Sequence, residues 1–400
     1  MDRREFLRFC GLAIPGAAWF GHTLACRRNP SAPPDEDLSG WDGVLDRLDG
    51  DLLHPPEKPV ALPFHPGEHF TKMPDGRVRC DLCPHRCTLA EGQRGRCRMR
   101  LVRDGVLGTD TYGRLISRQL VRPGTFPLMG LITTNWVRAG VFGCSFDCDF
   151  CSSLPESPTF PDPDRIRLVE QSPQDLADFM AAKGARHVNI GYFEPTVNFE
   201  YVRDFGRIAR QRGLSIHLDT NGFVEPQPLD ELLEVVDEIE VGLKGFDPAF
   251  YEEACKGTLP PVLECIRQVA RRGRLLTVGL LFIPGVGDDD GTVRNTLAWI
   301  RQNAGESTAL WIRGMVPARR MMRLSMTTSE FLERIEAEAH RQGFHYVSVV
   351  DARRGRIGPD VVPCPGCGRP VIRRLPDGTL ERNVRDGRCA SCGTAIRLWS

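Results

Sequence analysis

The sequence lacks an excess of charge of either sign, because 52 Lys and Arg residues balance 52 Asp and Glu residues. This balance removes any general electrostatic argument for binding to nucleic acid or to an acidic membrane surface, and no nucleic-acid partner is expected. The sequence also lacks an apolar run of the roughly 18 residues that a membrane-spanning helix requires. Lysine is scarce, with five residues, which we interpret as compositional bias. Internal repeats and low-complexity tracts are absent.

The length of the chain predicts more than one small domain. Its 400 residues and 44.7 kDa correspond to about two to three domains, or to one large α/β barrel with appendages. Apolar residues make up 41% of the sequence and charged residues 26%, so the chain can form a buried core and global disorder is excluded.

Cysteine is the most informative residue type, because the fifteen cysteines are not spread evenly. Four of them look isolated: Cys10, Cys26, Cys255 and Cys265. The other eleven form an N-terminal tetrad, a central triad and a C-terminal tetrad: Cys80, Cys83, Cys87 and Cys97; Cys144, Cys148 and Cys151; and Cys364, Cys367, Cys389 and Cys392. Disulfide scaffolds are typically short and secreted, and a globular chain of this length does not need them. Cysteines two or three residues apart converge more easily on one metal site, so we interpret all three groups as metal-binding.

Residues 1–26 resemble an export signal. The basic pair Arg3-Arg4 precedes a short apolar stretch, which is the build of a secretory signal and is too short to span a membrane. Together with Phe6-Leu7 the pair is similar to the twin-arginine signal that exports proteins already folded around a cofactor, and residues 23–26 resemble a lipoprotein cleavage site. An ordinary amphipathic N-terminal helix is the alternative. Residues 27–70 are rich in Pro and Asp and predict a linker.

A long alternation of strand and helix patterns predicts an α/β fold. Strands are expected at residues 137–142, 187–192, 214–218, 238–243, 275–283, 310–315 and 345–350. Helices are expected at residues 173–183, 198–212, 228–236, 260–272, 291–303 and 328–342. Six βα repeats and one further strand predict a parallel sheet, interpreted as a partial (βα)6 TIM-type barrel over residues 126–358. It is flanked by two predicted modules: a Cys-rich N-terminal module over residues 71–125, with a hairpin turn at Asp104-Gly105, and a zinc-ribbon-like module over residues 359–400, with a turn at Pro376-Asp377-Gly378.

The central triad follows the first predicted strand, in the segment Gly143-Cys144-Ser145-Phe146-Asp147-Cys148-Asp149-Phe150-Cys151. Its spacing would also fit three buried thiols on one face of a helix, but Ser and Asp residues give the segment poor helical propensity. Three thiolates on a loop are one short of the four that saturate a [4Fe-4S] cluster. One iron would keep an open coordination position, which is typical of a catalytic metal site.

The pattern C-x-x-x-C-x-x-C, with the aromatic Phe150 before the last Cys, resembles the signature of the radical S-adenosylmethionine (SAM) superfamily. The resemblance implies that Cys144, Cys148 and Cys151 hold a [4Fe-4S] cluster whose open iron chelates the amino and carboxylate groups of SAM. An electron from the cluster then cleaves SAM to methionine and a 5′-deoxyadenosyl radical, which abstracts hydrogen from a substrate. The cofactor carries that chemistry, and the protein supplies position and exclusion of water.

Further motifs fall at the C-terminal ends of successive predicted strands, where barrel enzymes carry their sites. They are Glu194-Pro195 after the second strand, Asp219-Thr220-Asn221-Gly222 after the third, Lys244 after the fourth and Ile283-Pro284-Gly285 after the fifth. Each alone is weak, because such residues usually belong to turns or solvated surfaces, but the ordered set is hard to obtain by chance. By resemblance, Glu194 is similar to the acidic residue that binds the SAM ammonium and joins the triad as a predicted catalytic residue. The residues expected to line the cofactor site are Phe150, Glu194, Asp219, Asn221, Lys244 and Ile283.

The closer resemblance is to the pyruvate formate-lyase-activating-enzyme-like branch, and within it to AmmeMemoRadiSam-system radical SAM enzymes. It covers roughly residues 72–350 and rests on Cys80-Asp81-Leu82-Cys83-Pro84-His85-Arg86-Cys87, Gly92, Gly95, Cys97, Arg100, Tyr112-Gly113 and Gly191-Tyr192-Phe193-Glu194-Pro195. Three places depart from the pattern: Ser152-Ser153 replaces Gln-Asn, Gly242 replaces the Asp of an Asp-Leu-Lys motif, and residues 310–314 lack the His and Arg of the sixth strand. We interpret this as a SAM half that is kept and a substrate half that has drifted.

The two tetrads predict further metal sites. The C-terminal tetrad forms two matching knuckles, and four thiolates on two turns close a tetrahedral site with no open position. A structural zinc ribbon is expected there, with a rubredoxin-type iron site as the alternative. The N-terminal tetrad fits neither pattern cleanly, and zinc and an auxiliary iron–sulfur cluster are equally expected. His85 beside it is expected to form local hydrogen bonds rather than to bind the metal.

The predicted function is a radical SAM enzyme, an activating-enzyme-like oxidoreductase that uses a [4Fe-4S] cluster, SAM and a structural Zn²⁺. Its expected partners are a low-potential electron donor of the flavodoxin or ferredoxin type and a substrate, either a glycyl-radical-type protein or another protein or small molecule. The alternative is a non-catalytic iron–sulfur/zinc electron-transfer or scaffold protein, which would have no use for Glu194 or for an unsaturated cluster. SAM and reductant are cytoplasmic supplies, whereas the twin-arginine-like segment predicts export or a membrane tether.

Overall fold

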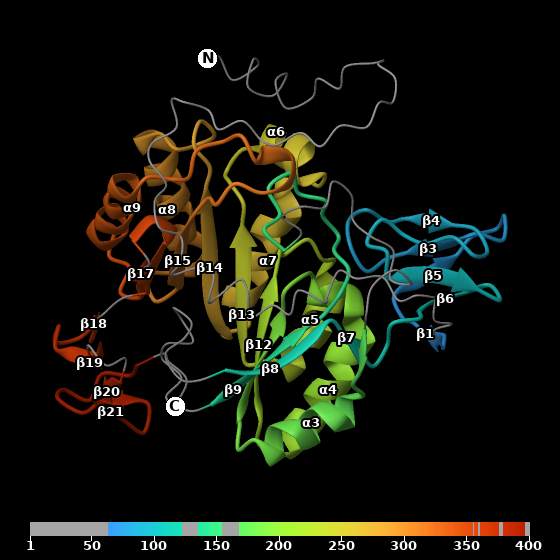
Figure 1. Ribbon diagram of the computed structural model, residues 1–400, viewed down its shortest axis with the longest axis horizontal. Coiled ribbons are helices and arrows are strands. Elements are labelled where there is room, and N and C mark those ends of the chain that lie inside the picture. Colours follow the sequence, from blue (N-terminus) through green and yellow to red (C-terminus); the bar gives the residue numbers. More distant parts are fainter. Residues whose placement is uncertain are drawn as a thin grey trace, which may run out of the picture.

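The computed structural model describes residues 63–121, 135–153, 168–354, 356–358, 361–375 and 379–396. The signal-like segment, most of the expected linker, and Cys10 and Cys26 lie outside the described residues. The described chain combines a large mixed sheet and its helices with small antiparallel sheets from both ends of the sequence (Figure 1). The predicted α/β class is confirmed. No helix among the described residues is long and apolar enough to cross a bilayer.

The main sheet has the strand order β17-β16-β15-β14-β13-β12-β11-β9-β8 in the described chain. Its parallel strands follow chain order and occupy the predicted strand positions: β9 (Trp136–Gly140), β11 (His187–Gly191), β12 (Ser215–Thr220), β13 (Glu238–Leu243), β14 (Leu275–Phe282), β15 (Ala309–Gly314) and β16 (Val347–Asp351). Antiparallel strands that the sequence pattern does not predict cover both edges, with β8 (Ser117–Val121) beside β9 and β17 (Arg356–Ile357) beside β16. Because the strands from β9 to β16 are parallel, their carboxyl ends all lie along the same side of the sheet, which is the edge where the strands end.

Helices connect the parallel strands, and each overlaps a predicted helix: α3 (Pro173–Ala182), α4 (Phe199–Gln211), α5 (Pro226–Val235), α7 (Leu259–Arg271), α8 (Asp290–Ala304) and α9 (Ser329–Arg341). Local chemistry sets where several of them begin. Ser172 and Asp175 form a capping box at α3, and the side chain of Asp289 caps α8. A short helix, α6 (Pro248–Phe250), which continues into the π-helical turn Tyr251–Cys255, has no counterpart among the predicted elements.

The two faces of the main sheet differ in chemistry. Side chains from alternate strand positions on one face are apolar and fully buried in the main core, as β12 and β13 illustrate: Ile216, Leu218, Ile239 and Val241. Side chains alternate along a strand, so the intervening residues lie on the opposite face. On β12 and β13 four of these six residues are charged or titratable, namely His217, Asp219, Glu238 and Glu240, and the other two are Ser215 and Gly242. The sheet therefore separates a packing face from a polar face.

The N-terminal region is built from short antiparallel strands: β1 (His65–Pro66), β2 (Phe70–Lys72), β3 (Val78–Cys80), β4 (Thr88–Leu89), β5 (Arg100–Arg103) and β6 (Val106–Thr109). β1 and the start of β2 lie inside the stretch expected to be a linker. The predicted β5–β6 hairpin is present, and its turn residues Asp104 and Gly105 have φ values of 53° and 66°, as a type I′ turn requires. β7 (Arg114–Leu115) pairs with β10 (Val169–Glu170).

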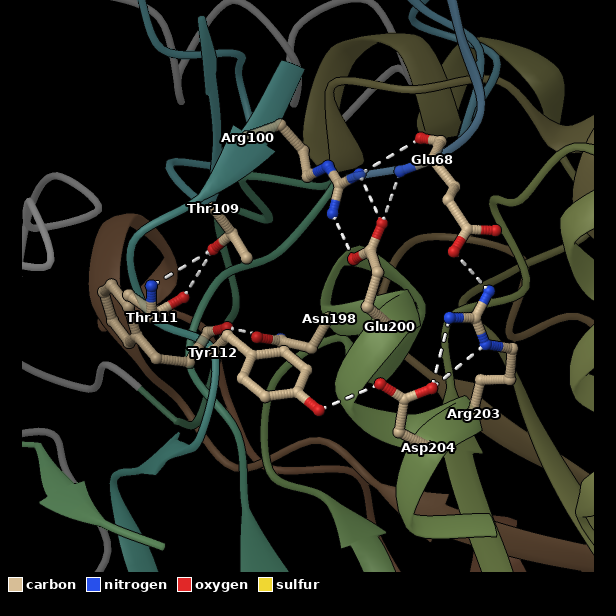
Figure 2. A network of polar contacts seen from close by, with 10 residues as sticks. Glu68, Arg100, Thr109, Thr111, Tyr112, Asn198, Glu200, Arg203 and Asp204 are labelled. Atoms are coloured by element: carbon tan, nitrogen blue, oxygen red, sulfur yellow. Dashed lines mark hydrogen bonds and ion pairs between the residues drawn. The ribbon is translucent and has the colours of Figure 1, made fainter. Parts of the chain in front are cut away.

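Apolar side chains of this N-terminal region belong to the same buried core as the main sheet, among them Val78, Leu82 and Leu89. A buried ion pair adds to this packing (Figure 2). Arg100 donates two hydrogen bonds to the carboxylate of Glu200 on α4, at 2.5 and 2.8 Å, and both residues are 1% exposed. Loss of one partner would leave the other charge buried without compensation, which strongly destabilises a protein. This contact therefore couples the N-terminal region to the main body.

The C-terminal region packs differently. Its described strands are β18 (Val361–Pro363), β19 (Pro370–Arg374), β20 (Leu380–Arg382), β21 (Val384–Arg385) and β22 (Arg388–Cys389). They surround a small core separate from the main one: Tyr346, Val362, Cys364, Val371, Ile372, Cys389 and Ile396. β19 and β20 pair antiparallel, and the turn predicted between them, residues 376–378, lies outside the described residues.

Candidate functional site

The central triad lies on the loop that follows β9, and this loop is not helical, as predicted. The backbone N–H of Glu194 donates to the carbonyl of Gly143 at 2.9 Å, which joins the loop to the end of β11. Cys144, Cys148 and Cys151 are each partly exposed and form no disulfide in the described chain. Burial raises the pKa of the Cys144 thiol well above its usual value, and the nearby Glu194 carboxylate adds to that shift. Because thiolates are the metal-binding form, binding a metal here must release the thiol protons.

Glu194 occupies the centre of a buried hydrogen-bond network between the ends of β11 and β12, and it is 1% exposed. Its Oε1 accepts from the backbone N–H and hydroxyl of Thr196, at 3.0 and 2.7 Å, and from the hydroxyl of Thr220 at 2.7 Å. Its Oε2 accepts from the backbone N–H of Asn221 at 2.7 Å. Burial raises the pKa of Glu194, and these donors oppose the shift. Both oxygens of Glu194 thus face hydrogen-bond donors, which only an acceptor at each position can satisfy.

Asn221 carries this network to the triad loop. Its Nδ2 lies 3.0 Å from the Oγ of Ser145 and 3.5 Å from the Sγ of Cys144. Its Oδ1 accepts from the backbone N–H of Phe223 at 2.8 Å, which holds the amide in place. Hydrogen bonds to ligand sulfurs adjust the reduction potential of an iron–sulfur cluster. The structure therefore brings the predicted site residue Asn221 directly to the triad.

Two arginines after β15, which the sequence analysis missed, hold the acidic residues of the triad loop. Asp147 accepts from Arg319 at 2.9 Å and from Arg320 at 3.3 Å, and Asp149 accepts from Arg320 at 2.7 Å. Arg319 also donates to the carbonyl of Cys148 at 2.7 Å, and its side chain is fully buried. We call Arg319 and Arg320 the arginine latch. Partners in this latch are more than 170 residues apart in the chain, so no local pattern could reveal it.

Cys255 is part of the site, and the expectation that it is isolated is wrong. Its thiol forms a hydrogen bond with Cys148, which together with burial raises the pKa of Cys148 well above its usual value. The backbone N–H of Asp147 donates to the carbonyl of Cys255 at 3.2 Å, and that of Asp149 donates to the carbonyl of Ala254 at 2.9 Å. The π-helical turn after α6 places Cys255 next to the triad loop, and the sequence did not predict that turn.

Phe150 and Lys244 lie at the same edge of the sheet. Phe150 is buried and stacks on Phe250, with 5.6 Å between ring centroids and 17° between ring planes. The backbone N–H of Lys244 donates to the hydroxyl of Tyr251 at 2.9 Å. A Cβ at Gly242 would lie 2.7 Å from the Nζ of Lys244, so in this conformation the lysine side chain lies close over Gly242. Gly242 thus accommodates this conformation of Lys244.

Asp219 and Ile283, the two remaining predicted contacts, differ in exposure. Asp219 lies on the polar face of β12, where it interacts electrostatically with Arg138 and Glu240. Ile283 follows β14, is 1% exposed and forms a bridge with Val286 across the turn that ends the strand. Asp219 therefore faces the polar side of the site, whereas the side chain of Ile283 packs in the main core.

A cluster of charged residues that the sequence did not predict lies on the polar face of the sheet, on β12, β13 and β15. His217 lies between two carboxylates, with Nδ1 3.3 Å from Glu238 and Nε2 3.7 Å from Glu240. Burial opposes the charge on His217, but the two carboxylates raise its pKa to about 10. The carboxylate of Glu240 also lies 3.6 Å from the guanidinium of Arg313. A Cβ at Gly279 would lie 2.8 Å from Glu240 and 3.0 Å from Arg313, so this glycine makes room for their contact.

The C-terminal tetrad converges on one point. All four Sγ atoms lie within 4.8 Å of one another, with Cys364 and Cys392 at 3.6 Å and Cys367 and Cys389 at 3.9 Å. With Zn–S bonds of about 2.3 Å, thiolates around one tetrahedral zinc lie about 3.8 Å apart. The donor set and its spacing therefore fit a single tetrahedral ion.

The N-terminal tetrad borders the triad loop. Three of its cysteines are buried and the fourth is partly exposed: Cys80, Cys83 and Cys97, and Cys87. The carbonyl of Cys97 accepts from the backbone N–H of Cys144 at 3.3 Å. The Nε2 of His85 lies 2.8 Å from the carbonyl oxygen of Ser145, so His85 forms a hydrogen bond to the triad loop.

The central triad fits a [4Fe-4S] cluster by the chemistry of its donors, because three thiolates can each bind one iron of the cluster. Among the described residues, only the C-terminal tetrad brings its ligand atoms within 4.8 Å of one another, as ligands of a single ion must be. The Sγ atoms of the central triad do not meet this limit as a set. Thiolates on different irons of a cluster lie farther apart than thiolates that share one ion. The backbone N–H of Phe146 points at the Sγ of Cys144 at 3.4 Å, which favours the thiolate.

Known proteins match this chain in sequence. Residues 141–297 match the family model described as the radical SAM superfamily. An uncharacterized protein of Methanocaldococcus jannaschii, MJ0808, is 31% identical over 332 residues, which cover 82% of this chain and 98% of that protein. The pyruvate formate-lyase 1-activating enzyme of Escherichia coli strain K12 is 32% identical over 114 residues, 28% of this chain, and the chain spans 46% of its length.

Solved structures also align with this chain, at low sequence identity. A radical SAM methyltransferase from Sphaerobacter thermophilus aligns with a TM-score of 0.44 and 15% identity, covering 74% of this chain and 81% of the other. A domain of a pyruvate-formate lyase-activating enzyme from Bacteroides vulgatus aligns with a TM-score of 0.36 and 16% identity, covering 40% of this chain and 94% of the other.

Proposed function

Since the chain belongs to the radical SAM superfamily, we propose that it is an enzyme that uses SAM and a [4Fe-4S] cluster to abstract hydrogen from a substrate. Cys144, Cys148 and Cys151 would hold the cluster. When bound, the cluster supplies one electron that splits SAM into methionine and the 5′-deoxyadenosyl radical that takes hydrogen from the substrate. The observation that carries the proposal is that the triad loop and the predicted strand-end residues meet at one edge of the parallel sheet.

The fold proposed for this core is a partial TIM-type barrel. Parallel strands in chain order, each connected to the next through a helix, support it. In such a fold the carboxyl ends of the strands form the site, and the polar face described above would line the interior. That face would meet the polar groups of the substrate, with Asp219 and Arg313 nearest the strand ends.

Glu194 and Asn221 act first as positioning residues. The carboxylate of Glu194 fixes the backbone of Asn221, and the Asn221 amide in turn contacts Ser145 and Cys144 on the triad loop. A contact between Glu194 and the SAM ammonium is the second part of this proposal. Oε2 accepts one hydrogen bond within the protein, and a carboxylate oxygen can accept a further charge-assisted bond.

The remaining predicted contacts would surround the SAM molecule. Lys244, held over Gly242, offers a cation for a carboxylate or for the ribose oxygens. Phe150, stacked on Phe250, offers an apolar wall, and Asn221 offers its amide. The arginine latch holds the triad loop from the other side, so the loop is fixed before any cofactor binds.

The electron donor would be a low-potential flavodoxin or ferredoxin-type protein. A glycyl-radical-type protein is the proposed substrate class, because the E. coli relative is named as a pyruvate formate-lyase activating enzyme. A different protein or a small molecule is the alternative substrate. The C-terminal tetrad would hold a structural zinc, supported by its convergent thiols. Export or tethering by the segment around Arg3-Arg4 stays a prediction, because that segment lies outside the described residues.

The test of the proposed function removes the triad. The variant Cys144→Ala/Cys148→Ala/Cys151→Ala should lose about four iron and four sulfide per chain relative to the wild type, and it should form no 5′-deoxyadenosine from SAM under dithionite. The matched control is Cys265→Ala, which removes a buried thiol from α7 and leaves the triad intact. Wild-type protein that binds iron at the triad but never cleaves SAM would favour the non-catalytic electron-transfer alternative.

A further inference from the structure

The four thiols of the N-terminal tetrad form a second group of cysteines, outside the proposed catalytic site. Cys80 ends β3, Cys83 and Cys87 lie on the loop between β3 and β4, and Cys97 precedes β5. None of the four forms a disulfide in the described chain.

Hydrogen bonds distinguish these cysteines from ordinary buried thiols. A backbone N–H lies against the sulfur of three of them: that of Leu82 against Cys80, that of His85 against Cys83, and those of Met99 and Arg100 against Cys97. The C-terminal tetrad has the same feature, because the N–H of Gly366 donates to Cys364 at 3.3 Å. Hydrogen bonds to the ligand sulfurs are also a feature of iron–sulfur sites.

Thiol spacing separates the two tetrads. All four thiols of the C-terminal tetrad lie within 4.8 Å of one another, as a single tetrahedral ion requires. Among the described residues, which include all four cysteines of the N-terminal tetrad, no three of its thiols meet that limit. The same holds for the central triad, which the family assigns to a [4Fe-4S] cluster. The N-terminal tetrad thus resembles the central triad, and not the C-terminal tetrad, in lacking the close convergence of thiols that one tetrahedral ion requires.

We propose that Cys80, Cys83, Cys87 and Cys97 bind a second [4Fe-4S] cluster. Four thiolates saturate the four irons and leave no open position, so this cluster would carry electrons rather than bind SAM. The buried guanidinium of Arg100 interacts electrostatically with Cys80 and Cys97, which places a cation beside the negative charge that four thiolates bring.

One hydrogen bond links the two sets of ligands. The carbonyl of Cys97 accepts from the backbone N–H of Cys144 at 3.3 Å, so a path of covalent bonds and one hydrogen bond joins a ligand of one cluster to a ligand of the other. Cys87 is the most exposed of the four and marks the side that faces solvent. A low-potential flavodoxin or ferredoxin-type donor would give one electron to the second cluster. That cluster would pass the electron to the first, so that one is oxidised as the other is reduced and no atoms move.

The test leaves the N-terminal tetrad untouched. We expect anaerobically purified full-length protein to contain about eight iron per chain, and the variant Cys144→Ala/Cys148→Ala/Cys151→Ala to keep about four iron and four sulfide. Dithionite should reduce that remaining cluster to a species whose electron paramagnetic resonance spectrum SAM does not change. The same variant with about two zinc and no iron per chain would overturn the proposal, as would one zinc and no iron.

A second measurement needs no variant and keeps the proposal falsifiable if the triple variant does not fold. In dithionite-reduced wild-type protein, SAM should perturb the resonance of about half of the clusters and leave the other half unchanged. Only about four iron per chain, all responsive to SAM, would contradict the second cluster. Retained iron in the triple variant together with a wild type that never cleaves SAM would refute the proposed enzyme activity and leave the second cluster standing.

Discussion

The N-terminal and C-terminal tetrads each gather four cysteines in short knuckle-like loops, but their surroundings differ. Cys80, Cys83 and the apolar residues beside them belong to the main core, Cys97 packs in a second cluster with Phe142 and Val197, and the buried Arg100–Glu200 pair attaches the region to α4. The C-terminal tetrad sits in a small core of its own and brings its thiols to one point. One tetrad depends on the main body for its shape, whereas the other would depend on its metal. We therefore expect two unfolding transitions, one for the main body and one for the C-terminal region.

The largest effect should follow loss of a C-terminal ligand. The substitution Cys389→Ala removes one of four convergent thiols from a region with few other buried residues. Structural zinc sites contribute about 10–16 kcal/mol of binding free energy, so the C-terminal transition should disappear and zinc should fall from about one to zero per chain. Calorimetry and metal analysis of the full chain check this. A C-terminal transition that survives without zinc would show that the small core suffices.

Loss of the buried acid in α4 should have the next largest effect, and on the other transition. The substitution Glu200→Ala leaves the guanidinium of Arg100 buried without its carboxylate, which costs about 3–5 kcal/mol. Urea unfolding should show the main-body transition shifted and the C-terminal one unchanged. The control Asp75→Ala breaks the exposed pair with Arg77 and should cost at most about 1 kcal/mol. Equal effects of the two substitutions would contradict the coupling of the N-terminal region to the main core.

The pH should also separate the transitions. His217 is protonated between Glu238 and Glu240, with its pKa raised to about 10 in the folded state against about 6.5 unfolded. Its stabilising contribution is complete below pH 6.5 and is lost as the pH rises to 10, because the folded state keeps a proton that the unfolded state has released. The main-body free energy of unfolding should therefore fall by up to about 1.4 kcal/mol per pH unit across this range. In His217→Gln the slope between pH 6.5 and about 8, below the range in which free thiols ionise, should vanish, and a slope that persists there would assign it to other groups.

The smallest effect concerns the contact between Glu194 and the triad loop. In Glu194→Gln an NH₂ group must face either the N–H of Asn221 or the donors at Oε1, whichever way the amide turns. We expect a cost of about 1–3 kcal/mol, seen as weaker SAM binding by roughly 5–150-fold and as lower cluster retention. The exposed substitution Glu252→Gln serves as the control. Normal SAM affinity and cluster content in Glu194→Gln would remove Glu194 from the site.

Local pattern predicted the parallel strands, the β5–β6 turn and the strand-end residues, because hydrophobic periodicity and turn chemistry are local properties. It did not reveal the arginine latch, since Arg319 and Asp147 are joined only by the fold. Cys255 was missed for a related reason, because a π-helical turn carries it to Cys148.

The polar face was missed because its residues are spread singly over several strands. Each charged residue on β12 or β13 alternates with an apolar one, so the pattern predicts a half-buried strand and says nothing about which charges meet. The contact of Glu240 with Arg313 across β14 also needs Gly279 between them. A gap of this kind is visible only when three strands are placed side by side.

The shared core of the N-terminal region has a consequence for recombination between relatives. The backbone N–H of Glu225 at the start of α5 donates to the carbonyl of Leu82 at 3.1 Å, far along the chain from the hairpins. A chimera joined between β8 and β9 would therefore take the two sides of these packing contacts from different relatives, so the residues in contact would no longer match. A junction just before β18 crosses far fewer such contacts, so the C-terminal region is the part that can be transplanted or trimmed as a unit.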